Sequence, residues 1–81
     1  MLCLSKNSIS DAGAMNFAHA LIINQSIRDL LLFDNEIGDE GAKRLAKALE
    51  ANHTINNLDL SGNKISIDVL RILESCHAIQ L

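Results

Sequence analysis

The fold is decided by the stretch Leu30-Leu31-Leu32-Phe33-Asp34-Asn35-Glu36-Ile37, because its pattern occurs three times at a fixed spacing. The same Leu-x-Leu-x-x-Asn-x-Ile pattern is found in residues 2–9 and again in residues 58–65, a shift of 28 residues in each direction. Between the first two copies the match continues through the next segment, at Asp11/Asp39, Gly13/Gly41, Ala14/Ala42, Ala18/Ala46 and Leu21/Leu49. Repetition at this period is typical of a solenoid, in which each unit packs only against its neighbours.

Composition and charge limit the possible functions. The chain has 81 residues, enough for one small domain, and 48% of them are hydrophobic with only two Phe. The net charge of −3 argues against nucleic-acid binding, which needs a clustered excess of Lys and Arg. No apolar run approaches the roughly 18 residues of a membrane span, and residues 1–5 lack a signal-peptide layout. The two cysteines lie far apart and form no disulfide framework. Together, these features lead us to expect a cytoplasmic protein without membrane contact.

Each unit is predicted to form a short strand, a turn and a helix. The apolar spacing i, i+3, i+4, i+7 of Ala42, Leu45, Ala46 and Leu49 predicts the buried stripe of a helix. Parallel strands stack about 4.8 Å apart whereas helices need about 8–10 Å, so the strands should line the inside of an arc and the helices its outside. The predicted fold is therefore an α/β solenoid of about three units in a single domain, 1–81, with unit boundaries 1–29, 30–57 and 58–81.

The ends of the predicted helices carry capping residues. Asp11 and Asp39 begin the first two helices, where a carboxylate can accept hydrogen bonds from the free N–H groups of the first turn. Asn24 and Asn52 close these helices, at positions where a left-handed residue is expected and Asn is second choice to Gly.

A polar residue recurs inside the apolar frame of every unit, as Asn7, Asn35 and Asn63. A side-chain amide both donates and accepts hydrogen bonds, so stacked Asn residues can satisfy the peptide groups of the turns from one unit to the next. Because strict repetition points to scaffolding, we predict a structural ladder, with an Asn-lined ligand site as the weaker alternative.

The third unit departs from the pattern. Ile67, Val69 and Leu70 stand where the earlier units have Asp, Gly and Ala, and the chain is expected to stop before a fourth strand. Solenoid ends normally carry a polar cap, which the segment around Met1 does not supply. Two alternatives stay open: a complete small protein that self-associates through uncapped ends, or a fragment of a longer array.

No catalytic or metal-binding arrangement is evident. Cys76 and His77 are adjacent and cannot readily reach one ion, while His19 and His53 lie in other units. No Ser/His/Asp or Cys/His set shares a plausible cleft. We therefore predict a protein that is not an enzyme and needs no metal or cofactor.

The repeat resembles the ribonuclease-inhibitor type of leucine-rich repeat. The resemblance rests on the Leu-x-x-Leu-x-Leu-x-x-Asn-x-Ile pattern, seen from Ile55 to Ile65, and on the Gly-Asp-Glu-Gly-Ala segment from Gly38 to Ala42. Repeats of this type occur in NOD-like receptors, the Ran GTPase-activating protein and the tropomodulin tail. The resemblance implies a strand-and-helix horseshoe with a buried Asn ladder, mostly cytosolic or nuclear, that binds other proteins.

One pair of residues differs from its repeat equivalents in a way that indicates a binding surface. Leu31 and Phe33 occupy slots that hold Cys, Asp or Ser in the other units, so the fold does not require apolar groups there. Two residues apart on a strand, they should point the same way, onto the inner face of the arc. An apolar pair with a polar rim is a typical interface centre. The acidic residues expected to form that rim are Asp29, Asp34 and Asp59.

The predicted function is therefore a protein–protein interaction module that binds a partner protein through the inner strand face. One alternative is a repeat protein that regulates a GTPase, as the Ran GTPase-activating protein does. The other alternative is a truncated fragment with no independent function.

Overall fold

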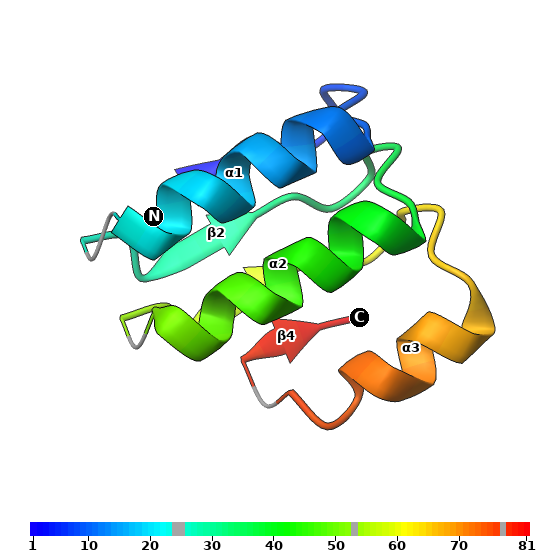
Figure 1. Cartoon of the computed structure of the whole chain (residues 1–81). Helices are drawn as coiled ribbons and strands as arrows, with labels where there is room; N and C mark the ends of the chain where they lie inside the picture. The colour runs from blue at the N-terminus through cyan, green and yellow to red at the C-terminus, as the bar shows by residue number, and fades with distance from the viewer. Residues whose placement is uncertain (24–25, 53, 77) are drawn as a thin grey trace.

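The computed structural model describes residues 1–23, 26–52, 54–76 and 78–81, in which strands and helices alternate along the chain (Figure 1). In chain order the elements are β1 (Leu2–Cys3), α1 (Asp11–Ile23), β2 (Asp29–Leu31), α2 (Asp39–Ala51), β3 (Asn57–Asp59), α3 (Ile67–Leu73) and β4 (Ile79–Gln80). The strands form one parallel sheet in the order β1-β2-β3-β4, and the helices lie side by side on one of its faces. This arrangement confirms the predicted α/β solenoid.

The sheet register follows the repeat of the sequence. Leu2 is paired with Leu30, and Leu30 with Leu58, so equivalent residues of the first three strands lie beside one another. Leu30, Leu32, Leu58 and Leu60 are buried between the sheet and the helices. The remaining buried apolar side chains are Ala14, Ala18, Leu21, Ile37, Ala42, Leu45, Ala48, Ile55, Val69 and Leu73. One core therefore runs through all units, although the helical positions that are buried in it differ from one unit to the next.

A fourth strand corrects the prediction that the chain stops before one. Strand β4 pairs in parallel with β3, and Ile79 lies opposite Leu58. The residues that pair between β3 and β4 are therefore 21 apart in sequence instead of 28. Most of the difference arises because α3 has 7 residues where α1 and α2 have 13 each. A search at the fixed period of the first two units misses this strand.

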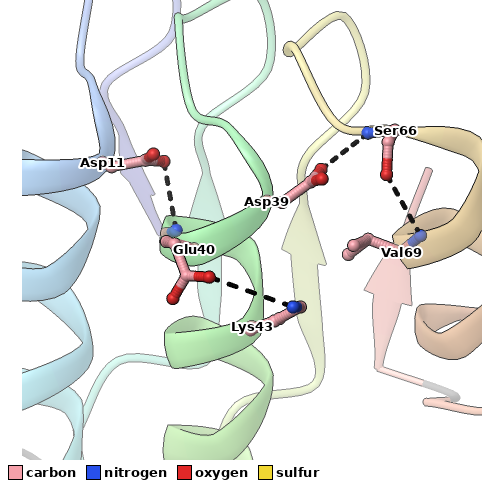
Figure 2. A network of polar contacts seen from close by, with 7 residues as sticks. Asp11, Asp39, Glu40, Lys43, Ser66 and Val69 are labelled. Atoms are coloured by element: carbon pink, nitrogen blue, oxygen red, sulfur yellow. Dashed lines mark hydrogen bonds and ion pairs between the residues drawn. The ribbon is translucent and has the colours of Figure 1, made fainter.

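The acidic residues at the helix starts cap the next helix and not their own, which corrects the prediction for Asp11 and Asp39. Asp11 Oδ1 accepts hydrogen bonds from the N–H groups of Gly38 (2.6 Å) and Gly41 (3.0 Å), at the beginning of α2. Asp39 Oδ1 accepts one from the N–H of Ser66 (2.7 Å), at the beginning of α3. Figure 2 shows both carboxylates directed toward the following unit. Each cap therefore also holds two units together.

The cap of α3 differs from that of α2 because Val69 stands where α2 has Gly41. A Cβ on Gly41 would lie 2.6 Å from Asp11 Oδ1, so a residue with a side chain keeps the carboxylate away from this N–H. In α3 the Ser66 hydroxyl accepts the hydrogen bond of the Val69 N–H instead, at 3.4 Å (Figure 2). Ser66 thus caps α3 locally, while Asp39 anchors Ser66 itself.

The hydrogen bond from Ser66 to Asp39 makes the stability of the folded chain depend on pH. Hydrogen bonds from the backbone N–H and then the side chain of Ser66 lower the pKa of Asp39 below its ordinary value of 3.8. Because the unfolded chain then binds the proton more tightly than the folded one, this stabilisation is present above pH 3.8 and is lost as the pH falls below it. We expect the urea midpoint of the wild type to fall as the pH is lowered below about 4, and that of Asp39→Asn to fall less, because asparagine does not take up a proton there. Identical pH profiles would contradict this role of Asp39.

The C-terminus of α2 corrects a second prediction. Asn52 is extended, with φ −114° and ψ 114°, and is not left-handed. Its side chain is buried: Nδ2 donates to the carbonyl of Leu21 at the end of α1, and Oδ1 accepts from the N–H groups of Thr54 and Ile55. Asn52 therefore ties the turn after α2 to the preceding helix. The equivalent prediction for Asn24 lies outside the described residues.

Candidate functional site

The face of the sheet opposite the helices carries the predicted binding residues. Parallel pairing places Leu31 between Cys3 and Asp59, and Asp59 beside Gln80, in one row across the strands. Two residues beyond this row, just after the ends of β1, β2 and β3, a second row contains Ser5, Phe33 and Ser61. We call these two rows the inner strand face, which consists of Cys3, Ser5, Leu31, Phe33, Asp59, Ser61 and Gln80.

Leu31 and Phe33 are the two hydrocarbon side chains of the inner strand face; its other members carry a thiol, a hydroxyl, a carboxylate or an amide. Both are half-buried, whereas Leu30 and Leu32, which alternate with them, are fully buried on the helix side. This alternation is that of a strand with one face in the core and one face open. The structure therefore brings the two predicted residues together, on the face opposite the helices.

The predicted acidic rim is brought together only in part. Asp59 is directly beside Leu31, and its Oδ1 accepts hydrogen bonds from the Ser61 N–H (3.0 Å) and hydroxyl (2.7 Å). Asp29 is half-buried at the start of β2. Asp34 is exposed in the turn after β2, where its backbone is left-handed with φ 55°. The two outer carboxylates thus flank the apolar pair at the two ends of its strand.

Cys3 is a member of the inner strand face that the sequence did not single out. Its side chain is exposed, and its sulfur lies 3.6 Å from Ser5 Oγ. Hydrogen bonding by the backbone and then the hydroxyl of Ser5 lowers the pKa of this thiol below its ordinary value. A free thiol next to Leu31 gives this face a chemical reporter.

The repeated Asn residues lie where the strands turn into the loops. Asn35 is buried; its Oδ1 accepts from the N–H groups of Asn7 (2.8 Å) and Ile9 (3.0 Å), and its Nδ2 donates to the carbonyls of Leu4 and Leu32. The Asn35 amide oxygen therefore satisfies two N–H groups of the preceding unit, and the amide nitrogen satisfies one carbonyl of each of the two units.

The other two Asn residues differ in burial. Asn63 is half-buried and repeats the arrangement one unit on, since its Oδ1 accepts from the N–H of Ile37 and its Nδ2 donates to the carbonyl of Leu32. Asn7 is exposed at the β1 edge, and its Nδ2 donates to the carbonyl of Ser5. The buried ladder that the resemblance implied therefore does not extend to Asn7.

The described residues form neither a metal-binding cluster nor a helix that could span a membrane. Within residues 1–23, 26–52, 54–76 and 78–81, no three His, Cys, Asp or Glu side chains are grouped so that they could hold a metal ion. In the same part of the chain, none of the helices is both long and apolar enough to span a membrane. Cys76 lies in the turn after α3, which ends at Leu73.

Comparison with known families gives one clear result. A search of curated protein sequences found no match. The family model described as "Leucine Rich repeat" matches residues 2–18, 24–46 and 51–66, which is more than half of the chain. Repeats of this family generally mediate protein–protein interactions and are generally not enzymatic. The match, the repeated register and the strand-and-helix units agree, and the chain belongs to the leucine-rich repeat family.

Proposed function

We propose that this protein binds a partner protein through the inner strand face, with Leu31 and Phe33 at the centre of the contact. The observation that carries the proposal is the pairing of Leu31 with Cys3 on one side and Asp59 on the other. The same scaffold position accepts a polar or a small side chain in the neighbouring units, so folding does not demand leucine there. A partner that covers the pair would account for its retention.

The charges around the pair favour a partner with basic residues. Asp59 adjoins Leu31, and Asp29 and Asp34 lie at the two ends of the β2 segment. The whole chain carries a net charge of −3. Apolar burial at the centre would supply affinity, while acidic groups at the rim would select complementary charges and raise the rate of association.

The finer family assignment is part of the same proposal. We propose that the chain is of the ribonuclease-inhibitor type found in NOD-like receptors, which is supported by the 28-residue spacing, the full helices of the first two units and the Asn at the strand end. We further propose a cytoplasmic location, which is supported by the two free cysteines, Cys3 and Cys76.

Phe33→Ser tests the proposed contact, because it installs the residue that the neighbouring units carry at the same position. We expect folding to be unchanged by circular dichroism, and capture of the partner to weaken by about 1–3 kcal/mol, the range of an aromatic interface residue. Quantitative mass spectrometry of proteins captured from cell lysate gives the comparison with the wild type. Leu31→Asp, which installs the residue of β3, should act in the same direction.

The matched control is Arg71→Ser, an exposed change on α3 on the opposite side of the sheet. It should leave capture unchanged. If Arg71→Ser abolishes capture while Phe33→Ser leaves it intact, the partner binds the helix side and the proposed contact is wrong.

A further inference from the structure

A groove on the helix side results from the short third unit. Ala18 and Leu21 of α1 are 6% and 2% exposed, because α2 packs along them. Ala46 and Leu49 are their equivalents on α2, and both are only half-buried. Helix α3 is six residues shorter than α2 and covers only part of it. The C-terminal half of α2 therefore lacks the neighbour that the same half of α1 has.

The uncovered segment borders a groove with a volume of about 620 Å³. Its apolar lining comes from Ala46 and Leu49 of α2, Ile55 after α2, and Ile72 and Leu73 of α3. Ile72 is 62% exposed, although it stands on a helix beside this groove. Six missing helical residues correspond to about 9 Å of helix. The groove thus has the dimensions left by one to two turns of helix.

The rim of the groove is more basic than acidic. Lys43 and Lys47 stand on the α2 side, together with Glu50. Lys43 lies 3.9 Å from Glu40, but both side chains are more than half exposed, so this ion pair is weak. In the described part of the chain, Lys47 forms no salt bridge. Two lysines are therefore available to acidic groups of a ligand.

We propose that this groove binds a short amphipathic helix of a partner protein, with apolar residues on one face and acidic residues along the edge that meets Lys43 and Lys47. The apolar face would take the place of the absent half of α3 against Ala46 and Leu49. The acidic edge would complement the lysines. This surface is on the opposite side of the sheet from the inner strand face, so the two surfaces do not share lining residues.

The two free cysteines allow one experiment to separate the two surfaces. Cys76 lines the groove, and Cys3 is on the inner strand face. The probe is a lactam-bridged helical peptide of about three turns, with Leu on one face and Glu along one edge. The rate of alkylation of each cysteine by iodoacetamide is followed by mass spectrometry as the peptide is titrated. We expect saturable slowing at Cys76 and an unchanged rate at Cys3.

A peptide and a protein variant with reversed charges test whether the two lysines select the acidic edge of the helix. The same peptide with Lys in place of Glu should protect Cys76 with roughly ten-fold lower affinity, which corresponds to about 1.4 kcal/mol. In the double variant Lys43→Glu/Lys47→Glu, the preference should invert, so that the Lys peptide protects Cys76 better. Because both lysines are exposed, this variant is expected to fold, and circular dichroism checks that it does.

Several outcomes would overturn the proposal. Absence of saturable protection at Cys76, or equal protection by the Glu and Lys peptides, would contradict a groove that selects an acidic helix. Slowing at Cys3 alone would place the peptide on the inner strand face. Slowing at Cys76 with increasing protein concentration and no peptide would identify a second copy of the chain as the occupant.

Discussion

Asn35→Ala is expected to lower the free energy of unfolding by about 2–4 kcal/mol, because it leaves several partly or fully buried peptide groups without a partner. The amide of Asn35 accepts from the N–H groups of Asn7 and Ile9 and donates to the carbonyls of Leu4 and Leu32. These groups belong to two consecutive units. Alanine can replace none of the four bonds, and water reaches the site poorly since Asn35 is 6% exposed.

The chain contains its own control for this substitution. Asn7 occupies the same repeat position but is exposed, and its side chain donates within its own unit, to the carbonyl of Ser5. Asn7→Ala and the surface change Lys43→Ala should each alter stability by no more than about 0.5 kcal/mol. Urea midpoints of the three variants decide the question. Equal midpoints would mean that the Asn35 amide contributes nothing to the stacking of the units.

The repeat predicts every feature that depends on a fixed period. The pairing of Leu2, Leu30 and Leu58 follows because residues 28 apart occupy equivalent places in a stack. The same comparison identifies the open face of the sheet, since a slot that accepts Asp59 in one unit cannot belong to the core. Internal comparison within one sequence therefore separates core positions from surface positions without a structure.

The period does not reveal which unit's helix a capping side chain binds. Asp11 and Asp39 could be recognised as capping residues from their place at the helix starts. A separation of 27 residues places Gly38 in the neighbouring unit, but whether the carboxylate of Asp11 accepts from the first turn of its own helix or from that of α2 depends on three-dimensional packing. The glycine at position 41 is the sequence feature that indicates the contact, because the absence of a Cβ lets the Asp11 carboxylate reach the Gly41 N–H.

The groove on the helix side was missed for a different reason. The groove arises because α3 is shorter than α2. A repeat pattern shows what the units share and does not show where one unit is shorter than the others. The signal was present in Ile79, which takes the strand position of Leu58 only 21 residues later. Allowing a variable unit length would have found β4, and with it the uncovered part of α2.

Gly41→Ala is the second substitution with a large expected effect, and its sign is decided by two opposing terms. Alanine favours a helix interior over glycine by about 1 kcal/mol. Against this, the added Cβ would lie 2.6 Å from Asp11 Oδ1 and 2.9 Å from the Cβ of Ala14, which cannot move without shifting α1. Overpacking of this kind costs about 1–3 kcal/mol and loss of a cap about 1 kcal/mol more. We expect a net loss of about 2 kcal/mol in stability.

Gly13→Ala provides the matched comparison, because Gly13 in α1 is the repeat equivalent of Gly41 in α2. Its added Cβ would lie 2.8 Å from Cγ2 of Ile9, so this branched side chain would also have to shift, but the atoms that the Cβ would meet belong to this one side chain. Gly13→Ala should therefore cost less stability than Gly41→Ala, in which the added Cβ meets Asp11, Ala14 and Ile37. If Asp11 is the group displaced in Gly41→Ala, then Asp11→Ala should cost less in that background than in the wild type, a non-additivity that thermal or urea unfolding of the double variant measures. Full additivity would show that Gly41 is needed for helix packing against Ala14 alone and that the Asp11 cap survives the substitution.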